Sequence, residues 1–152
     1  DEMMRPKFWK VSHGASIFSY EAVLDALNDH LVYVHKDTRA KATSQRTQAE
    51  DFIEAPIGDY FYLTHGNQGI YVLGQFSGAA NVFSTRGDGW LDRPYRHIKS
   101  AISRDGYGGS HKWWAPNDNS TFTPVPDDEL PLFEKHILRP YFGITLAKFA
   151  IT

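Results

Sequence analysis

The strongest local signal in this chain is a β-hairpin in its middle. Residues 60–64 (YFYLT) and 70–76 (IYVLGQF) are rich in the aromatic and branched apolar side chains that favour strands. The residues between these runs include Gly66, Asn67 and Gly69, which favour a tight turn. The sequence therefore predicts a sheet built around this hairpin.

Three further segments predict strands of the same sheet. Residues 7–11 form an aromatic-rich run that ends before a Ser-His-Gly turn, and residues 31–35 alternate and are rich in valine. Residues 93–102 predict a fifth strand after the hairpin. Strands are therefore expected to outnumber helices in an α+β fold.

Helices are predicted in three places. Ser19 is a good N-cap for a helix whose apolar residues fall at helical spacing up to about Asp29. Residues 48–53 predict a short second helix. A last helix is expected to begin at Asp127 and to end at Pro140, because proline breaks helical hydrogen bonding.

Length and composition fit one cysteine-free domain over residues 1–152. The absence of cysteine excludes a disulfide scaffold and a thiolate metal site, and it agrees with a cytoplasmic location. No apolar stretch approaches 18 residues, so we expect no membrane partner. We expect residues 1–4 to be a short added segment without ordered structure. The apolar sequence at 144–152 suggests a domain cut from a longer protein.

The net charge of −2 hides two basic segments, residues 35–46 and residues 86–104. Basic side chains gathered on one face can hold a phosphate backbone even in a nearly neutral protein. Ordinary solvated surface charge is the alternative interpretation, and it stays open. The candidates for phosphate contact are Lys36, Arg39, Lys41, Arg46, Arg93 and Arg96.

Three short motifs in a fixed order resemble those of a known family. They are Phe8-Trp9-Lys10-Val11-Ser12, Gly58-Asp59-Tyr60-Phe61-Tyr62-Leu63-Thr64-His65 and Gly74-Gln75-Phe76. Together with a late Trp-Trp loop and a final acidic helix, they resemble EVE and YTH domains of the PUA-like superfamily. The layout over roughly residues 6–143 is similar to the N-terminal specificity domains of McrB-type modification-dependent restriction GTPases.

The resemblance implies a small curved PUA-like, EVE-type β-barrel of about five to six strands with flanking helices. It also implies a pocket that takes one extruded, methylated base, with double-stranded DNA as the partner and no cofactor. A fused AAA+ GTPase and a nuclease subunit would act on what the domain recognises. Reading of modified RNA, as in YTH domains, is the alternative that the same resemblance allows.

Candidates for the base pocket lie at strand ends and in loops. They are Ser12, His13, Tyr33, His35, Thr64, His65, Asn67, Trp90 and Trp113. By resemblance to YTH domains, Tyr33 and Trp90 stand where those domains carry aromatic cage residues. Core packing of Tyr33 and turn stabilisation by the hairpin residues remain open alternatives, and so does a purely structural role for Trp113 beside Trp114.

Enzymatic interpretations find less support in the sequence. It has no His-x-x-x-His pattern, no Gly-x-Ser-x-Gly elbow and no phosphate-binding Gly-x-x-x-x-Gly-Lys. Small ASCH-type amidohydrolases are also PUA-like, and Lys10, Thr64 and Glu54 could imitate their catalytic trio. We expect a binding domain without catalytic residues or a bound metal; a pure protein-interaction module would leave the basic segments unexplained.

Overall fold

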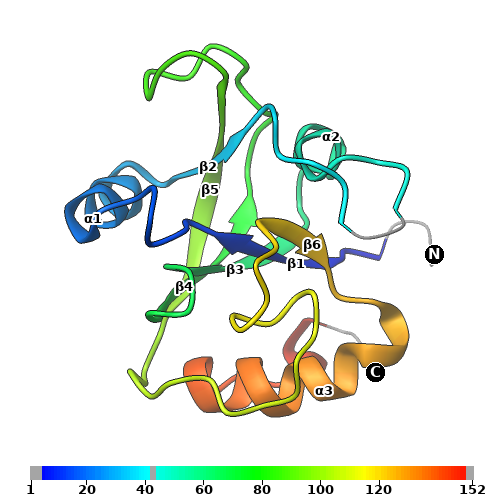
Figure 1. Ribbon diagram of the computed structural model, residues 1–152. Coiled ribbons are helices and arrows are strands. Elements are labelled where there is room, and N and C mark those ends of the chain that lie inside the picture. Colours follow the sequence, from blue (N-terminus) through cyan, green and yellow to red (C-terminus); the bar gives the residue numbers. More distant parts are fainter. Residues whose placement is uncertain (1–4, 42–43, 150–152) are drawn as a thin grey trace.

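A six-stranded mixed sheet curls into a half-barrel with helices against it (Figure 1). The structure, a computed structural model, describes residues 5–41 and 44–149, so the expectations for residues 1–4 and for the very end of the chain lie outside it. The strands follow the order β2-β5-β4-β3-β1-β6. Their bounds are β1 Phe8–Ser12, β2 Leu31–His35, β3 Tyr60–Thr64, β4 Ile70–Phe76, β5 Trp90–Ser100 and β6 Phe122–Pro124.

Strand β5 changes its hydrogen-bonding partner along its length. Its first half, from Trp90 to Pro94, pairs with β2, and its second half pairs with β4. The register shifts beside Gly74 of β4, where an added Cβ would lie 2.7 Å from the ring of Phe61 and 2.8 Å from that of Tyr95. Only glycine fits this close approach. All strand pairs are antiparallel except β1 with β3.

The first two helices begin where the sequence predicts them. Helix α1 spans Tyr20–Asp29, and the Ser19 side chain accepts a hydrogen bond from the Ala22 backbone at its start. Helix α2 spans Gln48–Glu54 and begins with a capping box formed by Thr47 and Glu50. Both starts satisfy backbone N–H groups that would otherwise have no partner.

The last helical segment differs from the prediction. It opens with a 3-10 turn at Asp127–Glu129, continues as α3 at Leu130–Phe133, and widens into a π-helix over Glu134–Phe142. Pro140 therefore lies inside the helix, and the prediction that it ends there is wrong. The wider turns accommodate the proline, and Gly143 ends the segment in the left-handed region at φ 65°.

Successive residues of the central strands feed two separate hydrophobic clusters, because side chains alternate across a sheet. Phe8 and Tyr62 pack into the cluster under the C-terminal helix, which also contains Trp114. Trp9 and Phe61 pack on the opposite side, inside the curl. Because the sheet is covered on both faces, every residue of β1 and most residues of β3 are buried.

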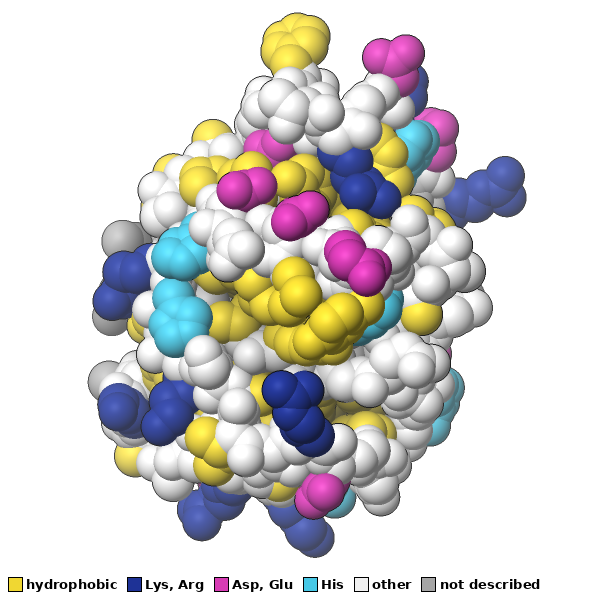
Figure 2. Space-filling model, turned by 90° about the vertical axis from the view of Figure 1, so that its left-hand side faces the viewer, with side chains coloured by type: hydrophobic (Ala, Val, Ile, Leu, Met, Phe, Trp, Pro, Cys, Tyr) yellow, Lys and Arg dark blue, Asp and Glu magenta, His cyan; other side chains and the backbone are white. Residues whose placement is uncertain are grey.

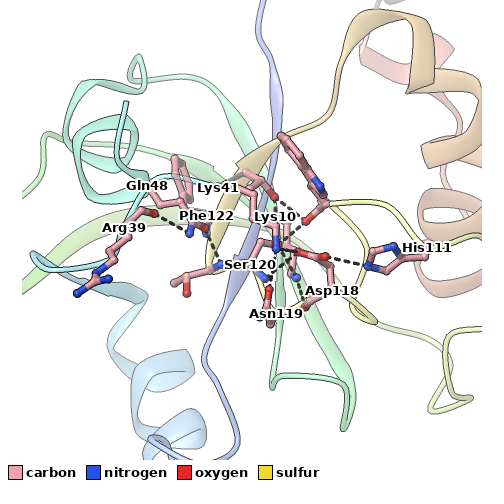
Figure 3. Close-up of polar contacts among 12 residues, drawn as sticks. Lys10, Arg39, Lys41, Gln48, His111, Asp118, Asn119, Ser120 and Phe122 are labelled. Atoms are coloured by element: carbon pink, nitrogen blue, oxygen red, sulfur yellow. Dashed lines mark hydrogen bonds and ion pairs between the residues drawn. The ribbon is translucent and has the colours of Figure 1, made fainter. Parts of the chain in front are cut away.

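Gln48 joins the two edges of the curled sheet. From the first turn of α2, its amide Nε2 donates to the Arg39 carbonyl after β2, at 2.9 Å. Its Oε1 accepts from the backbone N–H of Thr121 at 2.7 Å and of Phe122 at 2.8 Å, at the start of β6 (Figure 3). One buried side chain thus connects the strand edges that hydrogen bonding within the sheet leaves open.

The α+β class and the curved six-stranded sheet agree with the sequence-based expectation. Strand β5 begins at Trp90, earlier than predicted, and the short β6 was not predicted. In the ranges 5–41 and 44–149, no helix is both long enough and apolar enough to cross a lipid bilayer.

Replacement of Gln48 tests this closure. Gln48→Leu leaves the Thr121 and Phe122 N–H groups without their acceptor, which should lower the free energy of unfolding by about 2–4 kcal/mol. Urea denaturation measures it, with Gln68→Leu at an exposed hairpin position as the matched control. A loss no larger than that of the control would show that Gln48 does not hold the edges together.

Candidate functional site

A pocket of about 470 Å³ opens between the ends of β1 and β2 and two loops, a volume typical of small-molecule sites. Its walls come from parts of the chain that are far apart in the sequence. The residues that line it include Ser12, Ile17, Phe18, Tyr33, His35, Asn67, Trp90 and the loop 116–121.

One wall of the pocket is aromatic. Tyr33 of β2 and Trp90, the first residue of β5, come from paired strands, and Phe18 packs edge-on against Trp90 with ring centres 5.5 Å apart. His35 meets Trp90 edge-on at 5.1 Å. The Arg86 guanidinium lies 3.8 Å from the ring centre of Phe18 and 4.6 Å from that of Trp90, which is a cation–π arrangement.

The facing wall is the polar loop 116–121, with an amide, a carboxylate or a hydroxyl at each position from Asn117 to Thr121. Asp118 anchors this loop through its carboxylate, which pairs with Lys41 at 3.0 Å and with His111 at 2.8 Å. Lys41 also donates to Asn119 Oδ1 at 2.7 Å (Figure 3). These contacts hold the loop in a fixed conformation where it lines the pocket.

Lys10 supports this polar loop from below. Its side chain is fully buried, and its Nζ donates to the Asp118 carbonyl and to Ser120 Oγ, both at 2.9 Å. Burial lowers the pKa of Lys10 to about 7, although the Asp118 carboxylate opposes that shift. The protonation of Lys10 consequently changes near neutral pH, directly beneath the loop.

His13 is a buried residue that supports the aromatic wall from behind. Its Nε2 accepts the Tyr33 backbone N–H at 3.0 Å, and its ring stacks on Phe18 at 4.2 Å. Burial lowers the pKa of His13 to about 3, so the ring is neutral at physiological pH. Within the described chain its Nδ1 has no hydrogen-bond partner. His13 positions Tyr33 and does not itself line the pocket.

The structure brings five of the nine predicted pocket residues to the pocket wall: Ser12, Tyr33, His35, Asn67 and Trp90. The buried Thr64 donates to the carbonyls of Gly66 and Gly69, and His65 Nε2 bonds to the Phe18 carbonyl at 2.7 Å. These two residues, like His13, act as supports. The structure places Trp113 away from the pocket, beside Lys112 and Glu129, so its assignment to the pocket is wrong.

The predicted phosphate contacts divide in a similar way. Arg93 is buried, and its guanidinium donates to the carbonyls of Phe52, Ala55 and Gly78, so its assignment to phosphate is wrong. Arg46 pairs with Asp51 and Glu54 on α2.

Arg96 donates to Gln75 on the exposed side of the sheet. Lys36, Arg39 and Lys41 follow β2 on the pocket side, two of them exposed. On the face shown in Figure 2, lysine and arginine side chains are scattered and form no continuous band.

Three features of the pocket escaped sequence reasoning: Phe18, Arg86 and the loop 116–121. The loop carries three polar residues with amide or carboxylate groups in a row, Asn117 to Asn119, a composition that marks a loop but does not indicate what it faces. Phe18 precedes a helix cap and Arg86 precedes a glycine turn, so neither falls in a periodic pattern.

The amidohydrolase trio is not assembled. Lys10 lies under the loop 116–121, Thr64 bonds the hairpin carbonyls, and Glu54 is exposed on α2 against Arg46. In the part of the chain that is described, no group of three or more His, Asp or Glu side chains is placed to hold a metal ion.

No family model matches this chain, and no curated protein matches it significantly. Two crystal structures resemble it, each with a TM-score of 0.47. A protein from Agrobacterium tumefaciens is 13% identical, with 81% of this chain and 87% of that chain covered. A protein from Pseudomonas syringae is 14% identical, with 83% and 96% covered. Both are structural-genomics targets.

The buried Lys10 predicts a specific pH dependence of stability. The pKa of Lys10 is about 7 in the folded state and about 10.5 when unfolded. Below pH 7 the folded protein therefore bears the whole free-energy cost of burying a charged lysine. This cost disappears as the pH rises from 7 to 10.5. The free energy of unfolding of the wild type should therefore rise relative to that of Lys10→Met, by about 1 kcal/mol per pH unit. Urea denaturation at several pH values measures this difference, and parallel curves would contradict it.

Proposed function

We propose that this domain binds nucleic acid and inspects one extruded, modified base in the pocket between Tyr33, Trp90 and the loop 116–121. The observation that carries the proposal is the opposition of an aromatic wall to a fixed polar loop. An extruded base needs a ring face to stack on and donors and acceptors along its edge. Aromatic and polar residues line the same cavity here.

A methyl group would enlarge the apolar contact of such a base. Burial of one methyl contributes about 0.8 kcal/mol, which is enough for discrimination only where the wall is close and preorganised. His13 fixes the Tyr33 backbone, and Phe18 and His35 both pack edge-on against the Trp90 ring. The pocket thus has the rigid aromatic surface that this discrimination requires.

The basic residues after β2 are suited to position a phosphate backbone beside the pocket. Lys36 and Arg39 are exposed, and Lys41 joins the polar loop. Phosphate contacts fix the register of the nucleic acid, while the pocket would carry the selectivity. On this basis we propose double-stranded DNA as the partner and an EVE/YTH-like, PUA-like identity for the half-barrel. The cellular setting we propose is a cytoplasmic restriction or defence system whose effector lies in another domain or subunit.

Substitution of the aromatic wall tests the pocket. Trp90→Ala removes a stacking surface worth about 1–3 kcal/mol, so affinity for the preferred modified site should fall about tenfold or more. Fluorescence anisotropy measures this loss. The DNA ligands are matched duplexes with unmodified, adenine-methylated, cytosine-methylated or hydroxymethylated bases, and a separate series uses matched RNAs. Trp113→Ala, at an exposed tryptophan outside the pocket, is the control.

The result would contradict the pocket assignment if both tryptophan variants lost the same affinity, or if the loss were equal on modified and unmodified duplexes. Thermal melting separates binding from folding, because Trp90 is only half-buried at the start of β5. Tighter binding to the modified RNAs than to the DNA duplexes would change the partner to RNA and leave the pocket unchanged.

Charge substitutions should behave differently from the aromatic ones. Lys36→Ala or Arg39→Ala should weaken all sequences alike and make the log–log salt slope shallower by about 1. Binding measured between low and moderate salt gives this slope, with Lys135→Ala on the C-terminal helix as the matched control. An unchanged slope in both variants would show that the segment after β2 does not contact phosphate.

A further inference from the structure

Phe83 stands out on the loop between β4 and β5, which extends beyond the sheet at the end where β5 begins (Figure 1). Its side chain is 85% exposed, the highest value among the large exposed hydrophobic residues described, and the neighbouring Val82 is 52% exposed. An aromatic ring left in water at the tip of a loop contributes nothing to the two cores and calls for another explanation.

The loop around Phe83 is firmly built. Asn81 pairs with Asp92 of β5 through two backbone hydrogen bonds of 2.7 and 3.1 Å. The Asn81 side chain then accepts the Phe83 backbone N–H at 3.0 Å, and Ser84 Oγ accepts the Arg86 N–H at 3.2 Å. These contacts on either side hold the Phe83 backbone and leave its ring outside.

The same loop forms the outer side of the pocket's aromatic wall. Arg86, three residues after Phe83, lies over Phe18 and Trp90, and its Nη2 donates to the Ile17 carbonyl. Since consecutive Cα atoms are about 3.8 Å apart, the Cα atoms of Phe83 and Arg86 are at most about 11 Å from each other. Phe83 therefore lies on the loop whose Arg86 covers part of the aromatic wall, about one turn of chain away from it.

We propose that Phe83 is a wedge that enters the base stack of a duplex beside the nucleotide extruded into the pocket. This inference rests on the proposed function. Extrusion of a base costs stacking and pairing and leaves a gap in the duplex. Apolar side chains inserted between base steps fill such gaps in other proteins that deform DNA. An exposed phenylalanine on a hydrogen-bonded loop that also places Arg86 over the aromatic wall has the chemistry for this task.

A comparison of duplex with single strand isolates the wedge. Phe83→Ala should weaken binding to a duplex with the modified base about tenfold or more, and should leave binding to the single strand with the same base unchanged. A single strand has no gap to fill, which is the reason for the difference. Phe83→Leu should restore most of the duplex affinity, and Ile57→Ala, at another exposed apolar side chain (61%), should change neither.

These experiments distinguish failure of the wedge from failure of the proposed function. If the wild-type domain prefers no modified base in either form, the proposed function fails and the wedge fails with it. If Trp90→Ala weakens duplex binding but Phe83→Ala does not, the pocket stands and the wedge is overturned; the exposed tip would then suit an apolar groove of a protein. Equal losses on duplex and single strand would also overturn the wedge.

Discussion

A sheet that curls without closing leaves two strand edges facing each other, and the whole molecule depends on how those edges are connected. Helix α2 lies at this opening, and Gln48 bonds the chain after β2 on one side and the start of β6 on the other. The geometry of the pocket depends on the same hydrogen bonds of Gln48. Thr121, which Gln48 holds, belongs to the polar loop, whereas Tyr33 belongs to the strand on the opposite side.

The two walls of the pocket are supported by buried groups of different chemistry. Behind the aromatic wall, His13 is neutral and accepts a backbone hydrogen bond. Beneath the polar loop, Lys10 donates to a carbonyl and a hydroxyl, and its pKa of about 7 makes its charge responsive to neutral pH. His13 therefore stays neutral behind the aromatic wall near neutral pH, while the loop 116–121 is tied to a titrating group.

The sequence predicted the parts of the fold that have local causes. The hairpin over residues 60–76 and the helix capped by Ser19 both follow from neighbouring residues. The three-residue β6 contains a proline and has too short a pattern to be recognised, since only its pairing with β1 makes it a strand. Arg93 was expected at the surface because nothing local shows that three carbonyls converge on its guanidinium. The site could be predicted only in part for the same reason. Local patterns identify the residues at the strand ends, whereas tertiary packing brings the loop 116–121 to the same pocket.

The most direct test of the pocket as a base-binding site is nuclear magnetic resonance titration of the domain with free modified and unmodified nucleosides. The chain has four tryptophans, so the indole N–H signal of Trp90 can be assigned by substitution. We predict saturable shifts of the Trp90 indole and of the backbone amides of Asn117 to Thr121, larger for one modified nucleoside than for its unmodified parent. Shifts confined to Trp113, or no shifts at millimolar nucleoside, would contradict the account.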